Sequence, residues 1–379
     1  MSAKLPAAPP QFTSSFIPHP LSKSHKIHLI TSSPPPPPST SITTTSTTTT
    51  TTTTANPVLL IHGLGSAASF WLPSLSTVAG QHLCAQRQVY AIDAYGHGVS
   101  DFVGNEENSL DRAAETVKGV IEYLVGGAGA GAGAGAAGNN GKVVLVGHSM
   151  SGMDACVLAL LGFLKKRKTK RLTSAAAAAS GRANAYRVGL SLDNDIMGTN
   201  RTPSSLEMNG VDGVEGTDRG VLLSPTLELP PANRASLSER AATVLSPEGH
   251  LQISSAVSST AISRTSHVQQ PLAAAFIKHL VLTTRAEAYA QACKNLSSHP
   301  GWAADVAQIQ CEVFILGGEE DYMVPGPEIM KRAEQVPDGR GRGVIMQNVG
   351  HWGGLEVPER VAQELLAFVQ GEKAGKAPL

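Results

Sequence analysis

Short runs of β-branched and other apolar residues alternate along the chain with amphipathic segments, a pattern typical of βα units in a parallel sheet. The pattern predicts strands at 57–62, 89–93, 142–147, 187–192, 311–316 and 343–349. It predicts helices at 66–78, 109–124, 151–164, 328–334 and 358–369. Because the strands are continuously apolar, we expect a sheet that is covered on both faces.

Low-complexity segments interrupt this pattern. Residues 34–38 are five prolines, residues 47–54 are eight threonines, and residues 126–141 are mostly Gly and Ala. Such segments offer too little apolar surface to offset the entropy of ordering, so we expect solvated loops, with 126–141 as an expanded turn. Residues 195–270 are rich in Ser, Thr, Gly and Pro, and the pattern leaves their structure open.

The composition narrows the possible partners. The 379 residues include 30 Lys+Arg and 30 Asp+Glu, a net charge of zero that argues against a nucleic acid or a membrane surface as partner. No uncharged apolar run approaches the roughly 18 residues of a membrane span, and residues 1–30 lack the apolar core of a secretory signal. We therefore expect a cytoplasmic protein.

The cysteines and one basic run suggest no further chemistry. The four cysteines are far apart, so we expect core thiols and neither a zinc site nor a disulfide framework: Cys84, Cys156, Cys293 and Cys311. The basic run 165–171 fits a nuclear-import or polyanion patch, or a solvated loop with cations near a helix C-terminus. We prefer the solvated loop, which is the usual behaviour of charge runs.

The segment 142–152 contains a strand that runs directly into a helix, with Ser149 at the junction. This is a nucleophile-elbow pattern, in which small neighbours allow the strand and helix to approach closely. Gly147 and Ser151 are small, but the usual G-x-S-x-G pattern has Gly where Ser151 stands, and Gly152 follows one place later. The alternative is that Ser149 only caps the helix.

A serine nucleophile needs a base, and the base needs an orienting carboxylate. Asp321 follows the predicted strand 311–316, and His351 follows the predicted strand 343–349. Because loops at the carboxyl ends of parallel strands converge, we expect Ser149, Asp321 and His351 to meet. The alternatives are a turn aspartate and a histidine that caps the following helix.

Glu319 and Glu320 compete with Asp321 for the role of the orienting acid. We prefer Asp321 because its side chain is shorter and more easily held rigid, and because Pro325 follows four residues later.

An oxyanion-binding loop is expected after the strand 57–62, where Gly63 and Gly65 allow close approach to a substrate. We assign the backbone N–H groups of Leu64 and Met150 as its two donors. We interpret His62 and His148 as structural histidines, and residues 93–101 as a structural loop near the site.

These segments resemble the α/β-hydrolase superfamily, through the motifs LLIHGLG, AIDAYGHGVSD, LVGHSMSG, LGGEEDYMVP and NVGHWGGLEVPERV. The resemblance covers most of 57–164 and 275–370. It implies an α/β-hydrolase fold, with a mostly parallel sheet, helices on both faces and a helical cap between the sixth and seventh strands. It also implies Ser149 as nucleophile, Asp321 as acid and His351 as base.

The resemblance divides the chain into parts. We expect N-terminal strands and a low-complexity loop in 1–56, core in 57–194 and 303–371, a cap in 195–302 and a tail in 372–379. Within the cap, the helical spacing of 271–296 predicts a lid helix, or a helix that simply packs in the core.

The segments GSAASFW, which ends at Trp71, and YAQACKNL, which ends at residue 296, resemble the β-ketoadipate enol-lactonase group. The long cap and the inserts at 34–54, 126–141 and 165–186 depart from that group. We therefore expect a carboxylic ester or lactone hydrolase that forms an acyl-enzyme, with Trp71 and Trp352 contacting the substrate. A serine at the elbow disfavours the epoxide-hydrolase branch, which carries Asp there.

Two alternatives remain open at the level of sequence. This scaffold also resembles small-molecule receptors that turn over slowly or not at all, and cofactor-free haloperoxidase-like perhydrolases. In each case we expect no metal and no organic cofactor. The oligomeric state is left open.

Overall fold

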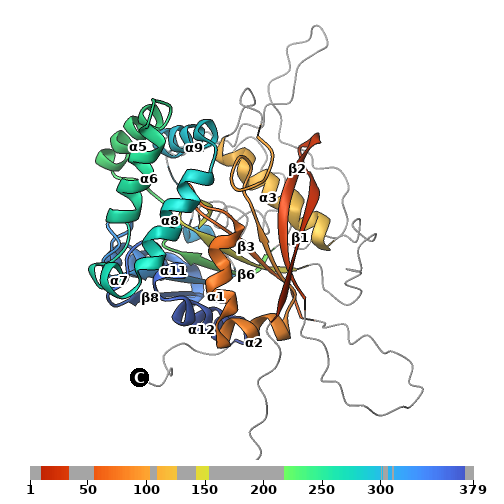
Figure 1. Ribbon diagram of the computed structural model, residues 1–379. Coiled ribbons are helices and arrows are strands. Elements are labelled where there is room, and N and C mark those ends of the chain that lie inside the picture. The colour runs from red at the N-terminus through yellow and green to blue at the C-terminus, as the bar shows by residue number, and fades with distance from the viewer. Residues whose placement is uncertain are drawn as a thin grey trace, which may run out of the picture.

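The structure is a computed structural model that describes residues 10–33, 55–102, 109–125, 142–152, 217–299, 301, 306–309 and 311–371. Within these ranges, one sheet has the strand order β1-β2-β4-β3-β5-β6-β7-β8. The N-terminal hairpin of β1 (Gln11–His19) and β2 (Ser22–Ser33) joins the sheet antiparallel to β4. The remaining pairs are parallel (Figure 1). The parallel strands are β3 (Val58–Ile61), β4 (Val89–Ile92), β5 (Val143–His148), β6 (Thr217–Leu223), β7 (Glu312–Gly318) and β8 (Gly341–Met346).

The parallel strands alternate their side chains between two apolar clusters, as the pleat of a strand requires. Val58 and Leu60 of β3 belong to one cluster, and Leu59 and Ile61 belong to the other. β4, β5 and β7 divide in the same way. All four residues of β3 are buried, because helices cover both faces. This confirms the predicted sheet with two covered faces.

Helices from both halves of the sequence cover the two faces. One face packs with η1 (Ala68–Trp71), α1 (Leu72–Ser76), α2 (Val78–Gln86), α11 (Gly353–Glu356) and α12 (Pro358–Val369). The other packs with α3 (Leu110–Val125), η2 (Val306–Gln308) and α10 (Gly326–Gln335). The short helix η3 (Pro337–Gly339) leads into β8. Helix α12 has the bounds predicted from sequence, with Pro358 in its first turn.

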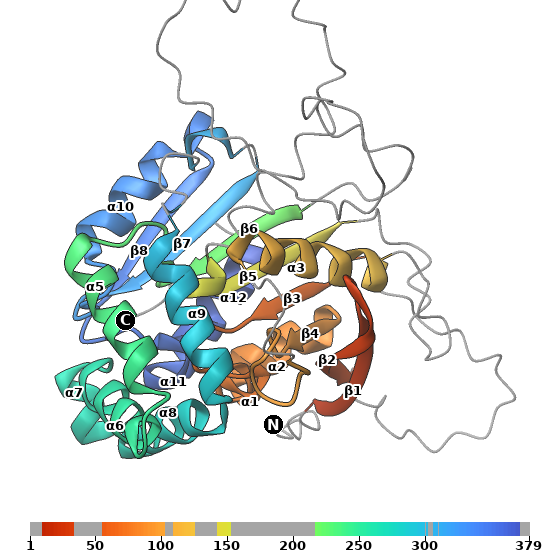
Figure 2. The ribbon, with the colours of Figure 1, turned by 90° about the horizontal axis from the view of Figure 1, so that it is seen from above.

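Among the described residues, five α-helices lie between β6 and η2: α5 (Pro231–Thr243), α6 (Gly249–Thr260), α7 (Arg264–Gln269), α8 (Pro271–Thr283) and α9 (Ala286–Ser298). We call this group the cap. Figures 1 and 2 show it gathered at one side of the sheet. The single lid helix predicted at 271–296 is wrong in one respect, because Thr284 and Arg285 are extended and divide it into α8 and α9.

The described ranges test some of the other sequence predictions. Several predictions fall outside the described residues: the strand at 187–192, most of the helix at 151–164, the basic run 165–171 and the core thiol Cys156. The strand beside β5 is β6, from a stretch whose structure the sequence left open. The segment 66–78, predicted as one helix, forms η1 and α1 and reaches the first residue of α2. Buried thiols are found at Cys84, Cys293 and Cys311, as predicted.

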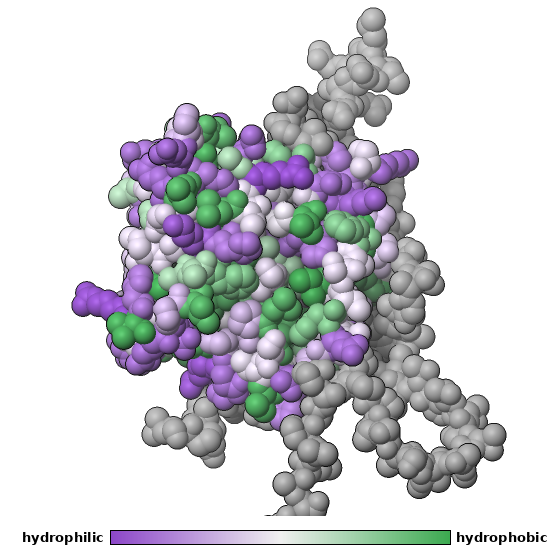
Figure 3. Space-filling view, viewed as in Figure 1, coloured by the Kyte–Doolittle hydropathy of each residue, from purple (hydrophilic) through white to green (hydrophobic). Residues whose placement is uncertain are grey.

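The visible surface is mixed in polarity. Hydrophilic and hydrophobic side chains are interspersed over the face in Figure 3. None of the helices that the structure describes has the length and apolar character needed to cross a bilayer. The domain boundaries proposed from the sequence stay predictions.

The buried carboxylate of Asp93 joins three segments at the end of β4. Its Oδ2 accepts hydrogen bonds from His28 Nδ1 at 2.8 Å and from the Val99 N–H at 2.9 Å, and its Oδ1 accepts from the Ala68 N–H at 2.6 Å. Burial alone would raise the pKa of Asp93, but the hydrogen bond from His28, the field of His62 and the two backbone N–H groups hold it below its ordinary value. The N-terminal hairpin is thereby attached to the core.

We predict that Asp93→Asn lowers the free energy of unfolding by on the order of 3 kcal/mol at pH 7, because an amide cannot accept from every donor around it. The depressed pKa gives stabilisation that is present above roughly pH 4, the unfolded value, and is lost as the pH falls toward the folded pKa. Urea unfolding should therefore show a smaller difference between wild type and variant at pH 3 than at pH 7. Asp338→Asn, at an exposed position, is the control. A pH-independent difference would contradict this account.

Candidate active site

The three residues expected to meet lie just beyond the carboxyl ends of three parallel strands. Ser149 follows β5 directly, Asp321 follows β7, and His351 follows β8. The order β5-β6-β7-β8 places all three strand ends at one edge of the sheet. All three side chains are buried. We refer to this arrangement as the candidate triad.

Ser149 lies on a strained turn between β5 and the helix that begins at Met150. Its φ is 54°, a left-handed conformation that non-glycine residues rarely adopt. A Cβ added to Gly147 would lie 2.2 Å from the Ser151 carbonyl oxygen, and one added to Gly152 would lie 2.8 Å from Pro225 Cβ. Both glycines are therefore required by close packing.

Ser151 replaces the glycine that is usual two residues after the serine, and the structure gives it a role. Its hydroxyl is fully buried and donates a hydrogen bond to the His62 carbonyl oxygen at 2.5 Å. The side chain thus links the elbow to the end of β3. Ser151 therefore fits at this position of the G-x-S-x-G motif, and its buried hydroxyl has a hydrogen-bond partner.

His351 connects the serine to the aspartate. Its Nδ1 lies 2.9 Å from Asp321 Oδ2 and 3.0 Å from Oδ1, and its Nε2 lies 2.8 Å from Ser149 Oγ. A carboxylate can only accept, so Nδ1 carries the hydrogen, and the Nε2 of the neutral ring accepts from the serine hydroxyl. This is the geometry that a general base requires.

The carboxylate of Asp321 is stabilised in its charged form. Burial would raise its pKa, but the imidazole of His351 and the hydrogen bond that the Val324 N–H donates to Oδ1 at 3.1 Å hold the pKa below its usual range. The Met323 N–H donates to Oδ1 at 2.9 Å. Asp321 is thus ionised at neutral pH and fixes the tautomer of His351.

The two competing glutamates point elsewhere. Glu319 Oε2 accepts from the Asn348 N–H at 3.1 Å, and Glu320 Oε2 accepts from the Arg264 N–H at 3.0 Å. Both glutamates therefore bind backbone N–H groups of neighbouring loops. The structure brings Asp321, and neither glutamate, to His351.

The loop after β3 lies against the serine. A Cβ on Gly63 would lie 2.8 Å from Ser149 Cβ, so the chain at Leu64 runs beside the elbow. Met150 follows the serine directly and is buried. The oxyanion role of Leu64 and Met150 stays a prediction, for which this adjacency is the support.

The rings of His62 and His148 form hydrogen bonds with backbone groups, as expected for the structural histidines that the sequence predicts. His62 Nδ1 donates to the Gly63 carbonyl at 2.8 Å and its Nε2 accepts from the Ala94 N–H at 2.9 Å, while burial lowers its pKa. His148 Nε2 donates to the His351 carbonyl oxygen at 3.0 Å. Burial and the neighbouring His351 lower the pKa of His148 to about 3, so its ring is neutral.

A group of aromatic rings packs beside His351, whose ring lies 5.3 Å from that of His148 between centroids. The His148 ring stacks on Phe70 at 4.5 Å between centroids and lies 5.5 Å from the Trp352 ring. Trp71 meets Phe70 edge-on at 4.8 Å. Both indoles are buried within the core cluster. The substrate contacts assigned to Trp71 and Trp352 stay predictions.

Sequence reasoning missed Glu356, which fixes the loop that carries His351. This buried carboxylate accepts from the backbone N–H groups of Gly350 at 2.9 Å, Trp352 at 3.1 Å and Ser263 at 2.9 Å. The His351 N–H in turn donates to the Ala261 carbonyl at 2.9 Å. The loop is thereby attached to the cap. The available signal was a carboxylate between apolar residues just before Pro358.

The comparisons with known proteins agree with this fold. The model of the alpha/beta hydrolase family matches residues 58–364, so the chain belongs to that family. No curated protein matches the chain in sequence.

Among the described residues, no group of three or more His, Cys, Asp or Glu side chains is placed to hold a metal ion.

Several solved structures share the fold at low identity. A thermophilic esterase from Thermogutta terrifontis, with malate bound, is 18% identical with a TM-score of 0.63, covering 95% of this chain and 98% of its own. The enol-lactonase from Burkholderia xenovorans LB400 is 15% identical with a TM-score of 0.60, covering 92% and 97%. An enzyme that degrades N-acyl homoserine lactones is 17% identical with a TM-score of 0.57, covering 93% and 99%.

We predict that Glu356→Gln lowers the free energy of unfolding by about 2 kcal/mol, because the amide nitrogen must face a backbone N–H that the carboxylate satisfies. Urea unfolding followed by tryptophan fluorescence measures the change. The matched control is Glu334→Gln on the exposed side of α10. Equal midpoints for the two variants would show that Glu356 does not fix the loop.

Proposed function

We propose that this chain is a serine hydrolase that cleaves a carboxylic ester or lactone through Ser149, His351 and Asp321. The observation that carries the proposal is the continuous chain of hydrogen bonds from Ser149 Oγ through both ring nitrogens of His351 to Asp321. A helix-capping serine or a helix-capping histidine would not require it. The esterase and lactonase names of the structural neighbours support the choice of substrate class.

In the first half of the reaction, Ser149 Oγ attacks the substrate carbonyl while His351 Nε2 takes the hydroxyl proton. The negative charge that develops on the carbonyl oxygen is placed against the N–H groups of Leu64 and Met150. Collapse of this intermediate breaks the bond to the alcohol oxygen, which receives the proton from His351. With a lactone, the alcohol stays attached to the acyl group.

In the second half, His351 takes a proton from water, and the hydroxide oxygen attacks the acyl-enzyme carbonyl. The bond to Ser149 Oγ breaks and the serine recovers its proton from His351. Asp321 remains ionised throughout and stabilises the imidazolium that forms twice per cycle. The carboxylic acid leaves, and the enzyme is restored.

We predict that the chain hydrolyses short p-nitrophenyl esters and that Ser149→Ala lowers kcat by about 10⁴ to 10⁶-fold, because the nucleophile is removed. Release of p-nitrophenol, corrected for spontaneous hydrolysis, measures the rate. Ser236→Ala, at an exposed position of α5, is the matched control and should act like wild type. If Ser149→Ala and wild type hydrolyse at the same rate, the hydrolase proposal fails and a binding protein remains.

A further inference from the structure

Thr226 lies beside the candidate nucleophile, in the turn that follows β6. Its hydroxyl oxygen is 3.4 Å from Ser149 Oγ, and its backbone N–H donates a hydrogen bond to the Ser149 carbonyl oxygen at 3.2 Å. The residue is 2% exposed. Two separate contacts, one from the side chain and one from the backbone, therefore hold Thr226 against the elbow.

The fold fixes this turn next to the serine. β6 pairs with β5 and with β7, so it ends between Ser149 and the loop that carries Asp321. The Leu223 carbonyl oxygen, at the end of β6, accepts from the Ser149 N–H at 2.9 Å. Ser224 then has a φ of 47°, a left-handed conformation, and two residues later the chain contacts Ser149 again through Thr226.

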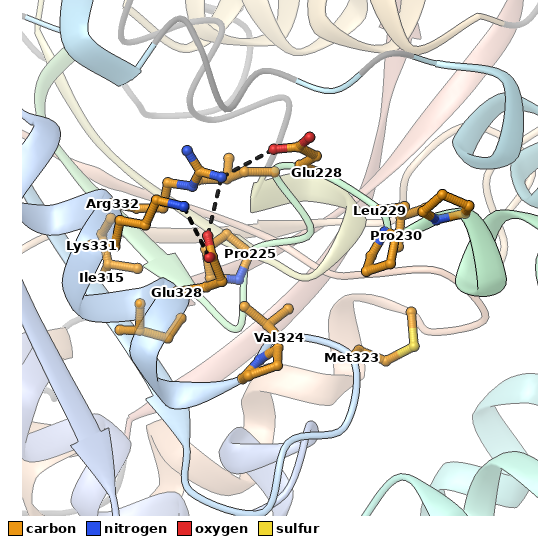
Figure 4. A pocket seen from close by; sticks show the side chains of 14 residues that line it. Pro225, Glu228, Leu229, Pro230, Ile315, Met323, Val324, Glu328, Lys331 and Arg332 are labelled. Carbon is orange, nitrogen blue, oxygen red and sulfur yellow. Dashed lines mark hydrogen bonds and ion pairs between the residues drawn. The ribbon is translucent and has the colours of Figure 1, made fainter.

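The residues on either side of Thr226 line a different surface. Pro225 and Leu227 lie along a groove of about 390 Å³ between the β6–α5 and β7–α10 loops, and Figure 4 shows Pro225 at its wall. Thr226, Ser149 and His351 do not line this groove. The Thr226 side chain is therefore directed to the serine and away from the groove.

The direction of the contact follows from the hydrogens that are present. The neutral His351 Nε2 accepts the hydrogen of the Ser149 hydroxyl. Toward Thr226 the serine oxygen can only accept, so the Thr226 hydroxyl is the donor. The distance of 3.4 Å makes this a weak contact in the free protein, because O–H···O hydrogen bonds are usually about 2.8 Å long. We expect it to shorten when negative charge develops on Ser149 Oγ.

Formation of the acyl-enzyme changes which group holds the serine oxygen. Once Ser149 Oγ is part of an ester it carries no hydrogen, so it and the neutral His351 Nε2 are both acceptors and cannot hydrogen-bond to each other. The Thr226 hydroxyl keeps its hydrogen and can still donate to Oγ. An ester oxygen is a poor acceptor, whereas the oxygen that departs during deacylation gains negative charge. The hydrogen bond from Thr226 is therefore stronger in the transition state of deacylation than in the acyl-enzyme.

We propose that Thr226 is a catalytic residue of the second half-reaction, in which its hydroxyl stabilises Ser149 Oγ as the leaving group. This inference rests on the proposed hydrolase function. In that step the bond between the acyl carbon and Oγ breaks, its electron pair stays on Oγ, and Oγ takes the proton that His351 Nε2 removed from water. Thr226 donates a hydrogen bond and transfers no proton. In the first half-reaction the serine oxygen accepts from Thr226 both before and during attack, so the contact changes the rate little there.

The test separates the two half-reactions with p-nitrophenyl acetate. p-Nitrophenolate is a good leaving group, so we expect acylation to be faster than deacylation. In that case kcat reports deacylation, while kcat/KM reports acylation. In Thr226→Val, which has a methyl group in place of the hydroxyl, kcat should fall by about 5- to 20-fold. KM should fall with it, so that kcat/KM stays within about 3-fold of wild type.

Thr226→Ser keeps the hydroxyl, and its kcat should stay within about 3-fold of wild type, which a role of the threonine methyl in packing would not produce. The matched control is Thr116→Val, at a buried position of α3 where the hydroxyl donates to the Arg112 carbonyl oxygen at 2.9 Å. It should leave kcat unchanged. The initial burst of p-nitrophenol counts the active sites, so the rates do not depend on how much protein is folded. If Thr226→Val does not fold, Thr226→Ala removes the same hydroxyl and takes its place.

Three results would overturn the inference and leave the hydrolase intact. The first is an unchanged kcat in Thr226→Val. The second is a fall in kcat/KM as large as the fall in kcat, and the third is a Thr226→Ser variant as slow as Thr226→Val. No Ser149-dependent hydrolysis of p-nitrophenyl acetate would overturn the proposed function and this inference with it.

Discussion

The hydrogen bond between His351 Nε2 and Ser149 Oγ, 2.8 Å long, is the contact on which the proposed chemistry depends. It joins residues separated by 202 positions, so it exists only if the ends of β5 and β8 are held in register across β6 and β7. The left-handed turn at Ser149 is the cost of presenting the hydroxyl there. Both requirements constrain parts of the sequence that carry no chemistry of their own.

Buried polar side chains that bind backbone groups hold these loops in place. Glu356 accepts hydrogen bonds from N–H groups in the loop that carries His351 and in the cap, and His148 donates to the carbonyl oxygen of His351. Asp93, at the end of β4, binds the backbone N–H groups of Ala68 and Val99 and also the imidazole of His28 in the N-terminal hairpin. Each is buried, and each would be unfavourable without its partners. The site is therefore held by directional contacts above an apolar core.

The sequence predicted the features that rest on local pattern. Apolar runs identified the strands on either side of β6, and Pro358 marked the start of α12. The positions of Ser149, Asp321 and His351 at strand ends followed from the same reasoning. β6 was missed because only 220–223 are apolar within a polar stretch, and its place is set by pairing with β5 and β7. The end of α8 at Thr283 and the hydrogen bond from Ser263 to Glu356 both depend on tertiary packing. The spacing of apolar residues along the chain carries no information about either.

In the proposed mechanism, His351 makes Ser149 a stronger nucleophile than any other serine of the chain. Reaction of the folded protein with a fluorophosphonate, followed by intact mass and peptide mapping, tests this most directly. We expect one adduct per chain, located on Ser149, and none when the protein is denatured with urea before the reagent is added. An unmodified Ser149, or modification spread over several serines at similar rates, would contradict it.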